Sequence, residues 1–390
     1  MEEVSPESRT ALSHLLRIVA GTRLRTMSTK QIGTLCSRKQ HFIKFLNNNK
    51  LGNNFALKGF TLITRNIIMA CYTAYLASGE TLLCKTIKSS TIKRYLDAAA
   101  ELSTHAQMIN PCLDIMGNQS VYITNILKEL KRWESMPNRK EPVTKQMIEY
   151  IIKKGQSLNN KNPNNIYTAL ADWLIVGQQA GFRRKEWAQD RTYLHKNKDI
   201  ERNIDGSSAA FILDDFQFRA KGDKRLKEFS LRDLKKSHTV NIKWRFQKNN
   251  DNGQVITYVI DNINKQHCVV EACKRIYKRA ISLKVPQDRP IAVFTQEKTG
   301  RNKTSYIDDI HIKNLLQEAA KNEYDIHCKK ELSAFTSHSI RVGACVLLHT
   351  QNISPEDIKF RLRWRSDTFR TYLRNNLQLA EKHRDAIANA

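Results

Sequence analysis

Between residues 28 and 134 apolar residues recur three and four positions apart, the spacing of the buried face of an amphipathic helix. Residues 122–133 illustrate the pattern, because Ile123, Leu127 and Leu130 fall on one helical face. Segments with the strict alternation of a half-buried strand are few in this part of the chain. The pattern therefore predicts a helical N-terminal domain.

Prolines and charged residues interrupt the apolar pattern at residues 135–142. Pro137 and Pro142 stand there among polar side chains, a composition typical of a linker between domains. A chain of 390 residues is longer than one domain usually is, so two domains are expected. The predicted organisation is a lead-in, a helical domain, a linker and a second domain, at residues 1–27, 28–134, 135–142 and 143–390.

The second domain combines helical periodicity with a short region that favours strands. Between residues 208 and 260 three segments are rich in Val, Ile, Phe, Trp and Thr, and a turn at 249–253 joins the last two as a hairpin. These strands are predicted at 209–216, 238–246 and 254–260. Helices are predicted around them at 144–154, 166–180, 269–283 and 307–321. The expected fold class is α+β, mainly helical with one small antiparallel sheet.

The charge of the chain indicates what these domains bind. Lys and Arg exceed Asp and Glu by 27, with 18 basic against 9 acidic residues in 1–138 and 47 against 29 in 139–390. Since the excess is present in both halves, a polyanion that contacts both domains is the expected partner. Nucleic acid is the obvious polyanion.

Signals for targeting and for metal binding are weak. The N-terminus is acidic and polar, and no apolar run is long enough to span a membrane. The eight cysteines are scattered without paired spacing, which indicates reduced thiols in an intracellular protein. The two His-Cys pairs, at 267–268 (with Cys273) and 327–328, lack the second close pair of a zinc site, so no metal is expected.

The residues that carry candidate chemistry lie near the C-terminus. Thr336 or Ser337 is placed to cap a helix that runs to about His349, and His338 and Arg341 share one face of its first turn. Backbone N–H groups at the start of a helix also favour an anion. Such a pair suits a phosphate, although an isolated His/Arg pair on a helix is more often only a solvated face.

Two further helices are predicted after this one, one ending at Trp364 and one carrying Tyr372. Their N-terminal signals are Ser354 followed by Pro355, and Ser366 or Asp367. The three helices would bring both aromatic residues next to His338 and Arg341. Cations that hold a phosphate beside a phenol that attacks it suit chemistry on a phosphodiester.

A second basic site precedes the predicted strands. Arg183 and Glu186 follow a long apolar helix and lie three residues apart, so the carboxylate is placed to brace the guanidinium for phosphate binding. Arg184 would take this place if the helix were rotated. Lys248 lies at the mouth of the hairpin turn, from which a lysine would reach into DNA. Alternative lysines in the same strand-rich region are Lys221, Lys224 and Lys243.

The order of these residues resembles the active-site series of tyrosine recombinases, the phage-integrase type, which share their catalytic domain with type IB topoisomerases. The series here is Arg183, Lys248, His338-x-x-Arg341, Trp364 and Tyr372. Residues 181–187, 244–249 and 362–375 are more similar to the recombinases of Crypton-type mobile elements of eukaryotes. These specific motifs span about 135–385, whereas 28–134 resembles the helical core-binding DNA-binding domain in size, position and helicity.

The resemblance implies how the phosphate would be held. Arg183 and Arg341 would contact the non-bridging oxygens of the scissile phosphate, and Glu186 would support Arg183. Trp364, in the slot that many relatives fill with histidine, would donate its indole N–H to the same phosphate.

The resemblance also implies which residues attack the phosphorus and transfer protons. Tyr372 would attack the phosphorus to give a 3′-phosphotyrosine and a free 5′-hydroxyl, Lys248 would protonate the leaving oxygen, and His338 would assist proton transfer at the tyrosine. No metal, ATP or other cofactor is needed. Trp364 and Tyr372 are eight positions apart where relatives have nine, which predicts a shorter connection. The poorer nucleophile candidates, because they precede the His-x-x-Arg motif, are Tyr306 and Tyr324.

The implied function is a site-specific DNA recombinase or integrase of a mobile element, acting on double-stranded DNA as a homotetramer on two duplexes. A nuclear location follows if the element is eukaryotic. The alternatives are a domesticated, catalytically silent DNA-binding protein and a relaxing enzyme of the type IB topoisomerase kind. A C-terminal helix at 377–388 is expected to dock either on a neighbouring subunit or on its own domain.

Overall fold

The chain divides into two units, residues 1–137 and 138–390, in the computed structural model. The division falls inside the segment 135–142 that the sequence marks as a linker. The predicted lead-in, 1–27, lies outside the described residues. The structure describes residues 29–52, 54–79, 87–107, 109–135, 139–203, 205–222, 233–247, 251–298, 301–373 and 377–388.

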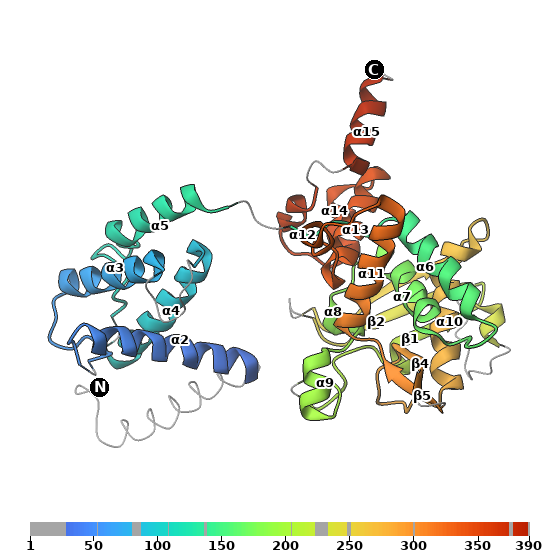
Figure 1. The fold of residues 1–390 in the computed structure, drawn as a ribbon, viewed down its shortest axis with the longest axis horizontal. Coiled ribbons are helices and arrows are strands. Elements are labelled where there is room, and N and C mark those ends of the chain that lie inside the picture. The colour runs from blue at the N-terminus through green and yellow to red at the C-terminus, as the bar shows by residue number, and fades with distance from the viewer. Residues whose placement is uncertain are drawn as a thin grey trace. The chain divides into compact units, whose positions relative to one another are not determined.

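The described part of the first unit is helical, as its periodicity predicts (Figure 1). Its helices are α2 (Thr29–Asn48), α3 (Leu62–Ser78), α4 (Ser89–Gln107) and α5 (Val121–Trp133). The Thr61 hydroxyl accepts the Thr64 N–H at the start of α3, and Gly79 ends that helix in the left-handed conformation. Buried apolar side chains from all four helices, among them Leu46, Tyr72 and Ile123, form one core.

The second unit is built around α7 (Ile166–Ala180), which is buried along most of its length. Helices α6 (Lys145–Leu158), α10 (Val269–Ser282) and α13 (Ser337–Thr350) pack against it. A helix with apolar residues on all sides is stable only when neighbours cover every face, so α7 forms the centre of this unit.

The remaining helical segments of this unit surround that centre. The α-helices are α8 (Arg184–Trp187), α9 (Arg191–Asn197), α11 (Asp309–Tyr324), α12 (Lys329–Leu332), α14 (Pro355–Leu362) and α15 (Leu377–Ala388). The 3-10 helices are η1 (Leu213–Asp215), η2 (Asp233–Lys236), η3 (Lys265–His267) and η4 (Asp367–Thr371). The predicted N-cap of α14 is present, since Ser354 accepts the Asp357 N–H, and at the start of α6 Thr144 accepts the Met147 N–H, a cap that was not predicted.

A small antiparallel sheet of order β1-β2-β3 completes the predicted α+β class. Its strands are β1 (Phe216–Arg219), β2 (Thr239–Trp244) and β3 (Gln254–Val259). The predicted hairpin is confirmed, because β2 and β3 pair with Thr239 opposite Val259 and Trp244 opposite Gln254. Alternate side chains on β2, namely Val240, Ile242 and Trp244, are buried.

The first predicted strand, 209–216, is wrong, because β1 begins at Phe216. The two acidic residues before it explain the shift. The Asp215 carboxylate accepts the Ile212 N–H at 2.8 Å and closes a 3-10 turn at Leu213–Asp215. The same buried carboxylate pairs with Arg245, so this segment turns toward the sheet before it becomes a strand.

A second hairpin, β4 (Val293–Lys298) with β5 (Arg301–Tyr306), was not predicted. Beyond Phe294 its residues are mostly polar or charged, so the apolar alternation that marks a strand is missing.

The segment before α6 belongs to the second unit as far as it is described. Lys140 donates to the Ser333 carbonyl at 2.8 Å, and the Glu141 N–H donates to the Ala334 carbonyl. At the other end, α15 contacts the end of α13, because Lys382 donates to the His349 carbonyl and to Asn352 of the same chain. No helix among the described segments is long and apolar enough to cross a membrane.

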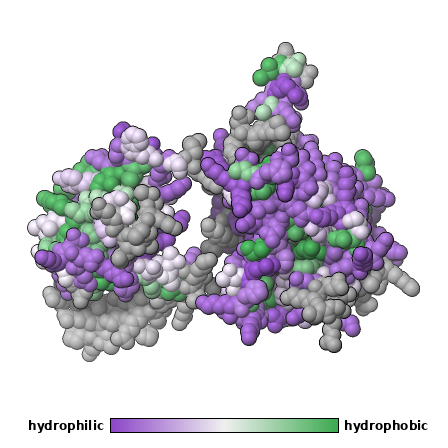
Figure 2. All heavy atoms as spheres, in the orientation of Figure 1, coloured by the Kyte–Doolittle hydropathy of each residue, from purple (hydrophilic) through white to green (hydrophobic). Residues whose placement is uncertain are grey.

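The surfaces of the two units differ in character (Figure 2). The visible face of the second unit is largely hydrophilic, in keeping with the excess of Lys and Arg in residues 139–390. The visible face of the first unit carries more hydrophobic area. Exposed large side chains of this unit include Ile63, Ile115 and Trp133. A hydrophilic, basic second unit fits a polyanionic partner.

Candidate active site

The turn that follows α7 positions the first arginine. Gly181 has a left-handed backbone (φ 56°), and a Cβ there would lie 2.6 Å from Leu362 Cδ2, so the turn requires glycine. Phe182 is fully buried after it, which holds Arg183 at the start of α8. The turn thus places Arg183 at one end of the central helix.

Arg183 and Glu186 form the ion pair that their spacing predicts. Arg183 Nη1 donates to Glu186 Oε1 at 2.9 Å, and the Arg183 backbone N–H donates to Oε2 at 3.0 Å. Glu186 is buried, whereas the Arg183 side chain keeps about a quarter of its surface exposed (26%). Glu186 therefore holds one side of the Arg183 guanidinium, and the other side is open to a ligand.

Arg341 approaches the same place from the first turn of α13. It is buried and donates to the Gly181 carbonyl at 2.6 Å and to the Leu362 carbonyl at 3.0 Å. Burial, and next the positive charge of Arg183, lower the pKa of Arg341 to about 9. A buried cation bonded mainly to neutral carbonyls is not charge-compensated, and a bound anion would relieve that cost.

Arg363 is a third arginine in this cluster, and the sequence did not identify it. Its Nη2 donates to Glu186 Oε2 at 3.0 Å and its Nη1 to the Ala180 carbonyl at 2.9 Å, with the guanidinium 3.9 Å above the Trp244 ring. The basic run 361–365 predicts a solvated surface, yet the Arg363 side chain is fully buried. No spacing in the sequence marks it, because α14 ends at Leu362 and the helical period ends there too.

The aromatic residues lie above the arginines. The Trp364 ring centre is 4.6 Å from the Arg341 guanidinium carbon and 5.2 Å from the Tyr372 ring. His338 Nε2 lies 3.1 Å from the Tyr372 hydroxyl. His338, Arg341, Trp364 and Tyr372 thus come together, as the sequence predicts. Arg183 is linked to them through Glu186 and Arg363, the residue before Trp364.

The segment that carries Tyr372 differs from its predicted form. The helix expected to reach Trp364 ends at Leu362, because Arg363 adopts a left-handed backbone (φ 56°). The next segment is a single 3-10 helix, η4, and Tyr372 follows it directly. The compact turn accommodates the short spacing between Trp364 and Tyr372, and Arg139 donates to the Thr371 carbonyl at 2.7 Å beside it.

Electrostatics distinguish the members of this site. His338 keeps an exposed surface, yet its neighbours partly remove the imidazole from water. This desolvation, followed by the charges of Arg341 and Lys140, lowers the pKa of His338. Burial alone would raise the pKa of Glu186, yet Arg363, Arg183 and Arg341 outweigh it and hold that pKa below its usual value. The four side chains Glu186, Arg183, Arg341 and Arg363 then carry a net charge of +2 beside a phenol and a neutral imidazole.

Alternative residues from the sequence lie elsewhere. Arg184 pairs with Glu201 at 2.5 Å on the other side of α8, so it does not replace Arg183. Tyr306 ends β5, and the Tyr324 hydroxyl hydrogen-bonds to Thr144 at the start of α6. Among the described residues, neither tyrosine contacts the arginine cluster.

The catalytic lysine of the resemblance is Lys248, which lies outside the described residues, as does Lys224. Lys221 and Lys243 are described, and both are exposed. The start of the hairpin turn is fixed by Gln247, whose backbone N–H donates to Asn252 Oδ1 at 2.7 Å. On the far side of the turn, Asp251 pairs with Arg365, next to Trp364. The turn is thereby tied to the segment of Trp364, and the choice among the lysines stays open.

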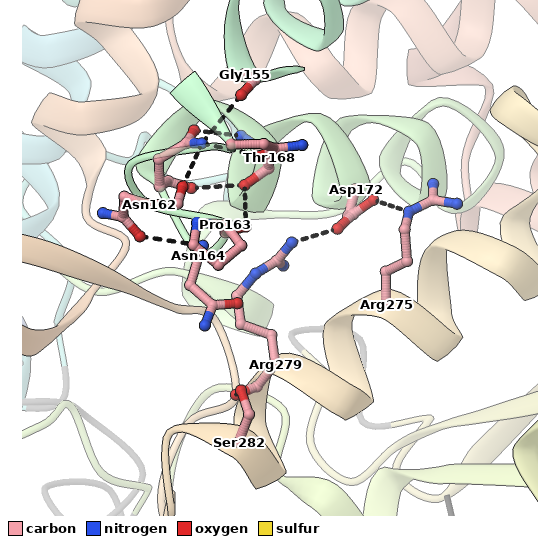
Figure 3. Close-up of polar contacts among 11 residues, drawn as sticks. Gly155, Asn162, Pro163, Asn164, Thr168, Asp172, Arg275, Arg279 and Ser282 are labelled. Carbon is pink, nitrogen blue, oxygen red and sulfur yellow. Dashed lines mark hydrogen bonds and ion pairs between the residues drawn. The ribbon is translucent and has the colours of Figure 1, made fainter. Parts of the chain in front are cut away.

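A cavity of about 790 Å³ lies away from this cluster, between α6, α7 and α10. Beside it, Asp172 on α7 accepts from Arg275 Nε at 2.5 Å and from Arg279 Nη2 at 2.6 Å (Figure 3). Asp172 precedes Gly181 by nine residues, which is about 13 Å along a helix. Since the buried carboxylate already pairs with both guanidiniums, we interpret this group as the ionic contact that fastens α10 to α7.

The substitution Asp172→Asn is expected to destabilise the second unit by about 3 kcal/mol, because it leaves buried Arg279 without a counter-ion. The value is at the low end for a buried pair, since Arg275 is partly exposed. Urea unfolding of wild type and variant measures the difference. Glu149→Gln, which removes a partly exposed carboxylate that pairs with Lys145 on the same helix, serves as control with an expected loss below about 1 kcal/mol. Equal losses in the two variants would contradict the interpretation.

Metal ligands do not gather in the described parts of the chain, where no group of three His, Cys, Asp or Glu side chains is placed to hold an ion. The two His-Cys pairs of the sequence have other contacts. His267 lies 3.5 Å from Glu149, Cys268 Sγ accepts the Asp261 N–H, and His327 pairs with Asp325.

Comparison with known proteins gives solved structures but no sequence match. No protein-family model and no curated protein matches the chain. The Tn1549 transposon integrase in complex with transposon right end DNA is 13% identical over 90% of this chain and 99% of that chain, with a TM-score of 0.41. XerH site-specific recombinase bound to difH substrate is 14% identical over 88% and 75%, with a TM-score of 0.44. A lambda integrase dimer bound to a core site is 11% identical over 95% and 96%, with a TM-score of 0.42.

Proposed function

We propose that this protein is a DNA strand transferase of the tyrosine recombinase type, which cuts and rejoins double-stranded DNA without metal or ATP. One observation carries the proposal: three arginines and Glu186, with a net charge of +2, lie beside a tyrosine hydroxyl that is 3.1 Å from a histidine. Preorganised cations stabilise the negative charge that develops on a phosphodiester under attack. A phenol beside a neutral imidazole supplies the nucleophile and a base.

The reaction divides the site into a binding part and a transfer part. Arg183 and Arg341 hold the non-bridging oxygens of the scissile phosphate, and Trp364 donates its indole N–H. Tyr372 Oη forms the new bond to phosphorus as the bond from phosphorus to O5′ breaks. The phenol proton passes to His338.

The leaving O5′ takes a proton from a lysine, for which Lys248 is the proposed donor. The product is a 3′-phosphotyrosine and a free 5′-hydroxyl. Because the phosphotyrosine conserves the energy of the broken bond, the 5′-hydroxyl of a second DNA end reverses the step and completes strand exchange.

The biological setting follows the same proposal. A basic first unit and a basic second unit contact one duplex, and four subunits hold two duplexes for exchange. Within this setting the protein is the recombinase of a mobile element, of the Crypton type.

A covalent adduct on DNA tests the proposal. Duplexes that bind the full chain are first selected from a randomised library, and the selected site is then nicked so that cleavage releases a short fragment and cannot be reversed. Wild type is expected to form a protein–DNA adduct that survives denaturation. Binding without an adduct would overturn the proposal and favour the silent DNA-binding protein. An adduct accompanied by relaxation of supercoils, with no joining of two duplexes, would favour the topoisomerase-like enzyme.

Cleavage is expected to slow once pH falls below the ordinary pKa of histidine, because His338 accepts the phenol proton only when it is neutral. Burial lowers the pKa of His338 from its ordinary value near 6.5, so the imidazole is neutral at pH 7 and the rate changes little above that pH. His338→Ala should reduce the rate by about 10²–10⁴ and remove this inflection. Single-turnover cleavage between pH 5 and 8 measures both effects. His349→Ala, at the other end of α13, should keep the wild-type profile, and an inflection that persists in His338→Ala would assign it to another group.

DNA binding is expected to weaken steeply with salt, since each phosphate contact releases counterions. The logarithm of the binding constant falls by ~0.9 per phosphate for each tenfold rise in salt, so about six contacts give a slope near −5. Fluorescence anisotropy with the full chain measures the slope. A slope near zero would contradict a partner recognised through its phosphates.

A further inference from the structure

Arg363 has a backbone conformation that an arginine rarely adopts. It follows α14 with φ 56° and ψ 54°, a left-handed turn that glycine or asparagine normally occupies. The turn directs the groups on both sides of it. The Leu362 carbonyl accepts from Arg341 Nη2 at 3.0 Å, and the Trp364 ring covers the Arg341 guanidinium at 4.6 Å. The backbone at Arg363 therefore shapes the surroundings of Arg341.

The side chain of the same residue reaches the other phosphate-binding arginine. Arg363 Nη2 donates to one oxygen of Glu186 at 3.0 Å, while Arg183 Nη1 donates to the other oxygen at 2.9 Å. Arg363 Nη1 donates to the Ala180 carbonyl, and Trp244 stacks on its guanidinium. One carboxylate thus connects Arg363 to Arg183.

We infer that Arg363 is a positioning residue of the phosphodiester site, holding Arg341 through its backbone turn and Arg183 through Glu186. It is fully buried, so it acts through these two arginines and does not touch the DNA. The inference rests on the proposed function, in which Arg183 and Arg341 bind the scissile phosphate.

A purely structural role for Arg363 would fasten α14 to α8 and nothing more. The two roles differ in what happens to Glu186. Charged groups facing this carboxylate are Arg183, Arg341 and Arg363, and Asp215 with its partner Arg245 lies beside it. Arg363 contributes the largest of the charge effects that keep the pKa of Glu186 low, against burial, which raises it. Without Arg363 the carboxylate takes up a proton at higher pH and then no longer braces Arg183.

The test compares Arg363→Met, Arg363→Gly and Arg363→Lys in the cleavage assay between pH 5 and 8. Met removes the charge, Gly also relaxes the left-handed turn, and Lys keeps a positive charge without the planar fork. We expect Met and Gly to lower the plateau rate by about 10²-fold, the effect of a misplaced binding group. In both variants the fall of the cleavage rate at low pH should become steeper and begin at higher pH, because Glu186 now takes up its proton in that range. Lys should restore part of the rate and of the profile. Arg361→Met, which removes a charge from the same segment where Arg361 stacks on Tyr258, should resemble wild type.

A uniform loss of rate with an unchanged pH profile in Met and Gly would overturn the inference, because a structural role predicts that result. If wild type forms no adduct, the proposed function fails, and thermal unfolding against pH then tests the link between Arg363 and Glu186 separately. The folded-state pKa of Glu186 is lowered, so its ion pairs stabilise the protein above its ordinary pKa and are lost as pH falls through the folded value. In Arg363→Met this loss should begin at higher pH than in wild type and in Arg361→Met. Coincident curves would overturn the inference.

Discussion

Replacing Tyr372 with phenylalanine is expected to abolish the covalent protein–DNA adduct while the protein remains folded and bound to DNA. The change removes only the hydroxyl, whose contact is with exposed His338, and keeps the ring beside Trp364. The stability loss should therefore not exceed about 1 kcal/mol. Loss of a nucleophile typically costs on the order of 10⁶ in rate, which puts the adduct below detection.

Two other tyrosines provide matched controls for this substitution. Tyr306→Phe and Tyr324→Phe each remove a phenol that lies outside the arginine cluster, and both variants should form the adduct at the wild-type rate. Digestion of the wild-type adduct and mass spectrometry should place the DNA on the peptide that contains Tyr372. An adduct that persists in Tyr372→Phe, or that maps to another peptide, would refute the assignment.

Local signals in the sequence were enough to predict most helices of the second unit. The predicted N-cap Ser354 accepts a backbone N–H group in the first turn of α14, and the predicted bounds of α7, 166–180, agree with the structure. Such signals act over three or four residues, so they can be recognised without knowledge of the fold. The pairing of Arg183 with Glu186 is local in the same sense.

What the sequence missed depends on contacts between distant segments. The sequence predicts Arg363 to be one of three surface arginines in 361–365. Its contacts in the structure are instead with Glu186, 177 positions earlier, and with Trp244. Its left-handed backbone, at a residue other than glycine, ends α14 two positions before the predicted end. The start of β1 was missed for a similar reason, since Asp215 is held by Arg245, thirty residues later.

Replacing Arg341 is expected to reduce cleavage far more than DNA binding. Two of its five N–H groups donate to the Gly181 and Leu362 carbonyls, which fix the guanidinium and leave three donors without a partner among the described residues. In the transition state the phosphate gains negative charge beside these donors, so Arg341→Met should lower the single-turnover rate by about 10²–10³, or about 3–4 kcal/mol. Binding of a long duplex depends on many other contacts and should weaken by less than about tenfold.

The lysine variant separates charge from geometry at this position. Arg341→Lys keeps a positive charge, but one ammonium cannot donate to both carbonyls and also present a planar fork to the phosphate, so it should recover little of the lost rate. Arg361→Met serves as the matched control, because it deletes the same charge from a side chain that stacks on Tyr258 outside the cluster. Rates for wild type and Arg361→Met should agree within about threefold, a far smaller difference than the loss expected at Arg341. Full activity of Arg341→Lys would mean that charge alone is needed, and full activity of Arg341→Met would remove Arg341 from the site.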